Sequence, residues 1–110
     1  MLLAGTDIAG ARIPGFSLHD ELAMLVTAGL TPMQALQTAT INPAVVLNQT
    51  KDRGTVETGR IADLVLLEKN PLSDIRNTTQ ISAVVLRGRL FTRADLDALL
   101  ALGQRLANDQ

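Results

Sequence analysis

Asp7 is the carboxylate whose place in the sequence is best suited to chemistry. It follows a short apolar stretch over residues 1–6, and Gly5 stands close before it. Enzymes built on parallel strands carry active groups at the carboxyl ends of the strands. A carboxylate there can bind a hard or borderline metal ion or act as a general base on metal-bound water. The structural alternative is an aspartate that only stabilises a turn.

His19 is the only histidine in the 110 residues, and there is no cysteine. These counts exclude disulfides, thiol nucleophiles, thiolate metal sites and a multi-histidine metal centre within one chain. His19 could orient a substrate or ligand through its imidazole. The sequence favours a structural interpretation, a partly exposed helix residue followed by Asp20 and Glu21, which suit a positive helix N-terminus.

Composition and charge exclude several classes of function. Ten basic and eleven acidic side chains give a net charge of −1, and there is no Trp or Tyr, so a nucleic-acid surface is not expected. No phosphate-binding glycine motif is present, and no apolar run approaches the roughly 18 residues of a membrane span. The first five residues are predicted to be mature structure rather than a signal peptide. Together with the absence of cysteine, this favours a cytoplasmic protein.

The elements that would position Asp7 and His19 lie in a helical first half. Residues 1–6 are predicted to form a buried strand that delivers Asp7 at its carboxyl end. From Leu18 onward, apolar residues recur at the spacing of an amphipathic helix. Ser17 is the predicted N-cap of this helix, and Gly29 is its predicted stop.

Two further helices are predicted from their start signals. Thr31, Pro32 and Gln34 have the types and spacing of a capping box with proline in the first turn. Asn42 followed by proline repeats a cap-plus-proline signal, which predicts a separate short helix over residues 43–48.

The hydrophobic period changes in the second half of the chain. Residues 62–67 and 81–86 are short, apolar runs bounded by turn residues, and they are predicted to be strands. Residues 90–91 are predicted to pair after a turn at Gly88. Asp63, at the start of the first run, is expected to cap or turn into the strand rather than to perform chemistry.

A terminal helix completes the predicted organisation. Thr92 and Asp95 have the spacing of a capping box, and leucines at helical spacing continue to about residue 107. A charged, glycine-ended stretch at residues 51–54 marks a boundary. The chain therefore divides into a first strand with its helices, a group of strands and an amphipathic helix, over residues 1–50, 51–91 and 92–110.

Taken together, these motifs resemble the amidohydrolase superfamily, in its imidazolonepropionase-like and prolidase-like branch. In chain order they are Gly5-Thr6-Asp7, Glu21-Leu22, Ala28-Gly29-Leu30-Thr31-Pro32, Ala35-Leu36-Gln37-Thr38-Ala39-Thr40, Asn42-Pro43-Ala44, Gly54-Thr55-Val56-Glu57-Thr58-Gly59-Arg60-Ile61-Ala62-Asp63-Leu64-Val65-Leu66-Leu67, Asn70-Pro71-Leu72 and Val84-Val85-Leu86-Arg87-Gly88.

The resemblance implies an α/β fold, the C-terminal remnant of a (β/α)₈ TIM-barrel metal-dependent hydrolase plus part of its flanking β-sandwich. Asp7 would end the eighth barrel strand, residues 17–50 would be the helices after it, and residues 54–91 would be returning strands of the sandwich. A complete barrel of this kind needs roughly 250 residues. The chain is therefore expected to supply only the end of the barrel.

The resemblance also implies a role for Asp7. The matching aspartate of the family binds the active-site divalent metal, zinc being the expected ion, and takes a proton from the metal-activated water. It then protonates the leaving nitrogen. The family's other metal ligands belong to earlier barrel strands, and His19 matches none of them. The chain alone is thus expected to be inactive.

The implied function is hydrolysis of carbon–nitrogen bonds in an amide, a cyclic amide or a prolidase-type dipeptide by the complete enzyme. The alternative is a non-catalytic interaction module that pairs with a chain carrying the rest of the barrel, because unpaired strands seek partners. A homo-oligomer or a complementing chain is the expected assembly, with neither nucleic acid nor membrane as a partner.

Overall fold

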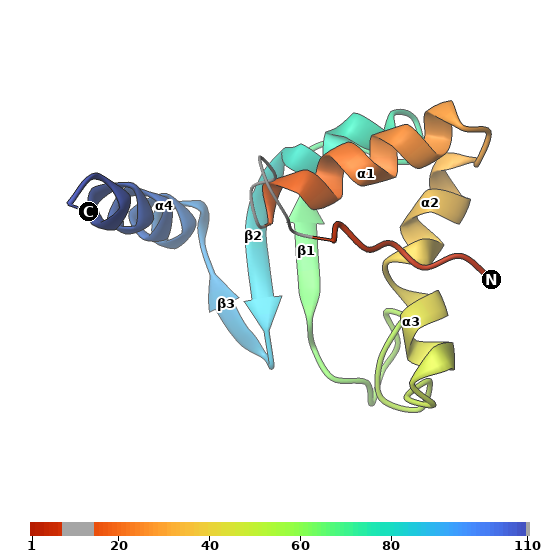
Figure 1. Ribbon diagram of the computed structural model, residues 1–110. Coiled ribbons are helices and arrows are strands. Elements are labelled where there is room, and N and C mark those ends of the chain that lie inside the picture. The colour runs from red at the N-terminus through yellow and green to blue at the C-terminus, as the bar shows by residue number, and fades with distance from the viewer. Residues whose placement is uncertain (8–14, 110) are drawn as a thin grey trace.

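Helices fill the first half of the chain, and a small antiparallel sheet follows them. The computed structural model describes residues 1–7 and 15–109. Figure 1 shows the order of the elements along the chain. Within the described residues they are α1 (Phe16–Thr27), α2 (Pro32–Thr38), α3 (Ile41–Val46), β1 (Leu64–Leu67), the 3₁₀ helix η1 (Ile75–Thr79), β2 (Ile81–Leu86), β3 (Arg89–Phe91) and α4 (Arg93–Asn108).

Residues 1–7 form an extended segment, called here the N-terminal segment, but not a strand. The prediction of a buried strand over residues 1–6 is wrong, since Met1, Leu2 and Leu3 are exposed. A strand requires hydrogen-bonded neighbours, and the described part of the chain brings none beside this segment. Two bonds to the helices hold it instead. The Ala4 N–H donates to the Thr38 carbonyl at 2.9 Å, and the Asn42 side-chain amide donates to the Leu2 carbonyl at 2.8 Å.

The first helix begins two residues earlier than its predicted cap allows. Gly15, at φ 83°, is the N-cap of α1, and no side chain caps the helix. Ser17 therefore lies inside α1, and its prediction as the cap is wrong. The predicted stop is confirmed, because Gly29 follows the helix at φ 119°.

Both of the next two helices are predicted correctly from the sequence, but the predicted cap is correct only for α2. Thr31 and Gln34 form the predicted reciprocal capping box of α2. The separate short helix is also confirmed, but α3 begins at Ile41 with Thr40 as N-cap. Asn42 lies inside the first turn of α3. It is not the cap, and its side chain bonds to the N-terminal segment instead.

The sheet has the order β1-β2-β3, with both pairs antiparallel. All three predicted strands are confirmed, β2 with the predicted bounds. Arg87 and Gly88 form the tight turn between β2 and β3, and both have positive φ, at 49° and 80°. This geometry matches the right-handed twist of the paired strands.

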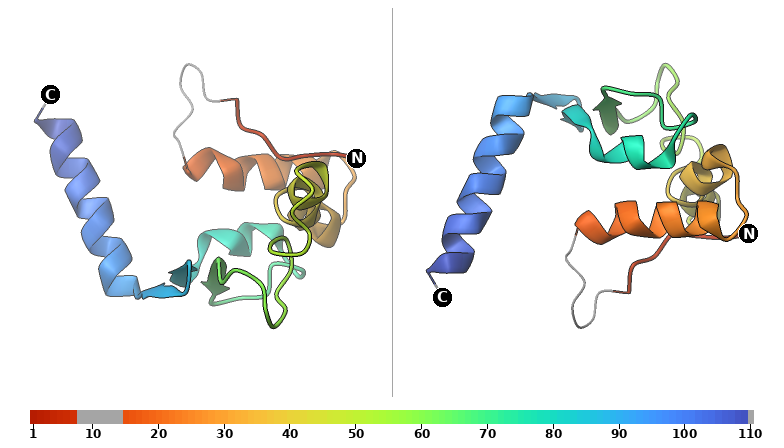
Figure 2. Two further views of the ribbon diagram at one scale, coloured as in Figure 1. Left: turned by 90° about the horizontal axis from the view of Figure 1, so that it is seen from below. Right: turned by 90° about the horizontal axis from the view of Figure 1, so that it is seen from above.

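The buried core is small and joins the two halves of the chain. Leu22 of α1, Ala35 of α2 and Ile75 of η1 form its centre, and Ala4 packs against them. The two views in Figure 2 place α1 between the N-terminal segment and η1. Thus α1 connects the segment that carries Asp7 to the second half of the chain.

The last helix, α4, stands apart from the rest of the molecule (Figure 1). The predicted capping box of Thr92 and Asp95 is confirmed, and no residue of α4 is buried.

The molecule exposes 8064 Å², whereas a compact chain of this mass exposes about 5,900 Å². Its radius of gyration is 15.1 Å against about 13 Å for a compact domain of this length. No helix among the described residues is long and apolar enough to cross a membrane.

Candidate functional site

Asp7 lies at the end of the N-terminal segment and is exposed. Its backbone has φ 46°, a left-handed conformation that aspartate tolerates better than most residues. The two hydrogen bonds from Ala4 and Asn42 fix the segment three to five residues before Asp7. Residues of α2 and α3 therefore determine where this carboxylate lies.

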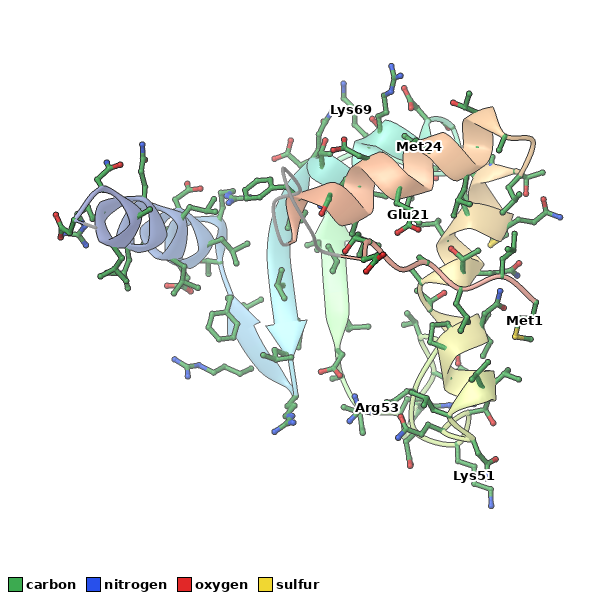
Figure 3. The ribbon with its side chains drawn as sticks, viewed as in Figure 1. Met1, Glu21, Met24, Lys51, Arg53 and Lys69 are labelled. Atoms are coloured by element: carbon green, nitrogen blue, oxygen red, sulfur yellow. The ribbon has the colours of Figure 1, made fainter. Side chains whose placement is uncertain are left out.

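A hollow of about 280 Å³ lies beside the end of the N-terminal segment. It is lined by Thr6 and by four residues of α1, which are Ser17, Asp20, Glu21 and Met24. Figure 3 shows Glu21 on the side of α1 that faces the N-terminal segment. The Glu21 Oε2 atom is shielded from solvent and has no hydrogen-bond partner among the described residues.

Sequence reasoning did not select Glu21 as a buried carboxylate. The signal was present, because Glu21 stands three residues after Leu18 and four before Leu25, at the edge of the apolar stripe. A charged residue within an apolar helical stripe is unusual, since burial of an unpaired charge is costly. An acidic residue at this position also suits the positive N-terminus of the helix, and this explanation conceals the burial of Glu21.

His19 does not line the hollow beside the N-terminal segment. The His19 Nδ1 atom is 2.9 Å from the Thr78 hydroxyl oxygen, 59 residues away. His19 is half-buried, Thr78 is buried, and the pair joins α1 to η1. His19 also lines a second, largely apolar hollow, of about 410 Å³, between α1, β2 and α4. The structure therefore supports a structural role for this histidine.

Asp63 is a structural residue, as predicted. Its Oδ1 atom accepts a hydrogen bond from the Arg87 N–H at 2.8 Å, and its Oδ2 atom pairs with Arg53 at 3.3 Å. Asp63 thus ties the loop before β1 to the turn between β2 and β3.

The described residues do not form a metal site of their own. They contain no group of three or more histidine, cysteine, aspartate or glutamate side chains that could hold an ion. A catalytic zinc takes three protein ligands. Within the described ranges, Asp7 does not belong to a group of that size.

Comparison with known proteins places the chain among amidohydrolases. The model of the Amidohydrolase family matches residues 2–91. An adenine deaminase of Ligilactobacillus salivarius is 38% identical over 68 residues, which cover 61% of this chain and 12% of that protein. An imidazolonepropionase of Deinococcus deserti is 37% identical over 81 residues, which cover 73% of this chain and 20% of that protein.

The structural comparison agrees with the sequence comparison. A crystal structure described as a prolidase from Bifidobacterium longum superposes with a TM-score of 0.75 and 36% identity, over 90% of this chain and 26% of that one. The chain is thus an α/β piece that aligns with part of an amidohydrolase structure, and the described residues do not themselves make a barrel. It spans only about an eighth to a fifth of the first curated relatives. With 90 of its 110 residues inside the match, the chain belongs to the amidohydrolase family.

Proposed function

We propose that this chain is part of a metal-dependent amidohydrolase that hydrolyses carbon–nitrogen bonds, and that Asp7 is its active-site carboxylate. The observation that carries the proposal is the family match over residues 2–91, which includes Asp7. The anchoring of the N-terminal segment on α2 and α3 gives Asp7 a defined place at the end of that segment.

The chemistry proposed for Asp7 is that of a carboxylate that moves protons. A divalent ion held by Asp7 and further ligands would supply a water whose pKa is lowered toward about 7. The Asp7 carboxylate would take the released proton and later donate it to the leaving nitrogen. Since the described residues do not form a metal site, the ion's remaining ligands must come from outside them, and the isolated chain is expected to be inactive.

The substrate is proposed only as a class. The relatives carry the names adenine deaminase, imidazolonepropionase and prolidase, which differ in substrate. We therefore propose a small molecule with an amide, a cyclic amide or a prolidase-type dipeptide bond. In barrel enzymes the loops after the strands determine specificity, and nearly all such loops lie outside this chain.

A chimera tests the proposal directly. Residues 1–91 would replace the matching segment of the Bifidobacterium longum protein, and zinc content and hydrolysis of prolyl dipeptides would be measured. We expect Asp7→Asn to lower kcat by at least about 10²-fold. The control is Asp52→Asn, an exposed carboxylate in the loop after α3, which should keep the rate.

Two results would contradict the proposal. One is a chimera that keeps its rate after Asp7→Asn. The other is an isolated chain that binds stoichiometric zinc as a monomer and hydrolyses amides. The second result would show that the chain needs no further ligands.

A second candidate function is a non-catalytic module that completes another polypeptide. The observation in its favour is the exposed area, 8064 Å² against about 5,900 Å² for a compact chain of this mass. Purification from the native host, followed by light scattering, tests this candidate. Recovery of the chain only as a free monomer would count against it.

A further inference from the structure

Glu21 has a buried carboxylate oxygen that the other described residues do not use. Its Oε2 atom is shielded from solvent without a hydrogen-bond partner among residues 1–7 and 15–109. Buried polar atoms in folded proteins almost always have a partner, and an unpaired buried charge is strongly unfavourable. The partner of Glu21 is therefore expected outside the described residues.

The charges around Glu21 indicate what this partner must be. The ion pairs of the described residues join Arg53 to Asp63, Arg60 to Glu57 and Arg93 to Asp97. None of them reaches the hollow beside Glu21, and the described residues that line it include a second carboxylate, Asp20, and no basic side chain. A cationic group would complement this hollow.

The exposed apolar side chains of α1 and the N-terminal segment favour a polypeptide over a metal ion. Met24, which lines the hollow, is 69% exposed, and Met1 and Leu2, at the other end of the N-terminal segment, are 78% and 55% exposed. Exposed apolar side chains at this density mark a surface that another chain segment covers. The described residues do not offer the three or more donors that a metal ion would need.

We propose that Glu21 is a positioning residue, which pairs through Oε2 with a lysine or arginine of the polypeptide that covers the N-terminal segment and α1. This pair would hold α1 in place against the segment that ends in Asp7. The inference rests on the proposed function, since the covering polypeptide is taken to be the remainder of the amidohydrolase.

The proposal predicts opposite effects of one substitution in two settings. In the isolated chain, Glu21→Gln removes an unpaired charge and should raise Tm by about 1–4 °C. In the assembled chimera the same substitution leaves a buried cation without its partner and should lower Tm by about 4 °C or more. Asp52→Asn is the control, an exposed carboxylate in the loop after α3 that does not line the hollow, and it should change Tm by about 1 °C or less in both settings.

Kinetics of the chimera separate positioning from simple destabilisation. At a temperature where every variant is folded, Glu21→Gln should lower kcat about tenfold and leave KM within about twofold, because Glu21 does not touch the substrate. A merely structural residue would change Tm without this loss of kcat. In the same chimera, the rate of Asp7→Asn tests the proposed function, and this test does not depend on the role of Glu21.

Several outcomes would overturn the proposal. A fall in Tm of the isolated chain with Glu21→Gln would show that the carboxylate already has a stabilising partner within the chain. An equal effect on Tm in both settings would show that assembly brings no cation to Glu21. A rise in Tm on adding zinc chloride to the isolated chain, lost in Glu21→Gln, would show that the hollow binds a metal ion instead. A fall in Tm of the isolated chain, or a zinc effect lost in Glu21→Gln, would overturn the proposal even where the chimera does not fold.

Discussion

At the scale of single residues, the hydrogen bond between His19 and Thr78 is the polar link between α1 and η1. The two atoms are 2.9 Å apart and Thr78 is 7% exposed. Thr78→Val keeps the shape of the side chain and removes the hydroxyl. We expect it to lower the free energy of unfolding by about 1 kcal/mol, as measured by urea denaturation, because the imidazole nitrogen loses its buried partner.

Thr78→Ser is the control, because it keeps the hydroxyl and should preserve most of the link. If Thr78→Val were as stable as the parent chain, the bond would contribute nothing and His19 would be free for another role.

The candidate site was only partly predictable from its residues. Asp7 could be selected because its type, the preceding glycine and its place in a family motif all lie within one short stretch. The burial of Glu21 depends on the N-terminal segment packing beneath α1, and that contact joins residues far apart in sequence. The Asn42 side chain is a similar case, since its bond to Leu2 spans 40 residues.

At the scale of elements, the capping box of α4 makes this helix sensitive to acid. The Thr92 N–H donates to the Asp95 carboxylate at 2.9 Å, and this bond, followed by that with the Thr92 hydroxyl, lowers the pKa of Asp95 below its usual value. A lowered pKa stabilises the fold above the ordinary carboxyl pKa, and the stabilisation is lost as the pH falls through the lowered value. Amide NMR signals of the first turn of α4 should therefore show fraying only in that acid range.

Asp95→Asn should remove most of this pH dependence, and Thr92→Ala should cost about 1 kcal/mol at neutral pH. The pKa of Glu57 is also lowered, first by the Thr55 hydroxyl and then by Arg60, so this carboxylate too stabilises the fold less in acid. A residue-specific probe is needed for this reason. Unchanged first-turn signals down to strongly acid pH would contradict the prediction.

Gly54 is the glycine at which the loop before β1 meets α3. Its φ is 102°, and a Cβ atom there would lie 2.9 Å from the Ala44 Cβ atom and 3.2 Å from the Ile41 Cα atom. Gly54→Ala therefore adds a clash to a strained backbone, and we expect a loss of about 2 kcal/mol or more in thermal or chemical unfolding.

Gly59 is the matched control for Gly54. Its φ is 88°, but no atom lies within 4 Å of the position of an added Cβ. Gly59→Ala should show the cost of backbone strain alone, about 1 kcal/mol. Equal losses for the two alanine variants would show that contact with α3 is unimportant.

Elements with strong local signals were predicted well. The capping boxes of α2 and α4 and the apolar run of β2 carry their own signals, and the structure confirms all three. The strand predicted over residues 1–6 is wrong because pairing is not a local property. An apolar run of that length forms a strand only where other strands lie beside it.

At the scale of the whole molecule, β1 is an open edge of the sheet. Val65 is 57% exposed and Leu66 is 62% exposed, although successive strand residues point to opposite faces, so both faces of β1 are uncovered. Exposed apolar edge strands promote association. We expect the isolated chain to self-associate with concentration in analytical ultracentrifugation, and Val65→Lys to weaken this association while changing stability by about 1 kcal/mol or less.

Arg60→Lys, on the connecting loop away from the edge, should leave association unchanged. If Val65→Lys associated as strongly as the parent chain, contact between copies would occur through another surface, such as the leucine face of α4.

The anchoring of the N-terminal segment has a consequence for the order of folding. The sheet and α4 join residues close in sequence, whereas the Ala4 bond to Thr38 and the Asn42 bond to Leu2 each close a loop of more than thirty residues. Contacts between distant residues form late, because the chain entropy of loop closure must be overcome first. Asp7 should therefore reach its final position only after α2 and α3 have formed. A chain in which these helices do not form should not hold the Asp7 carboxylate in that position. Pulse-labelling hydrogen exchange would show this as protection of the Ala4 amide after that of the β2 amides, and simultaneous protection would refute it.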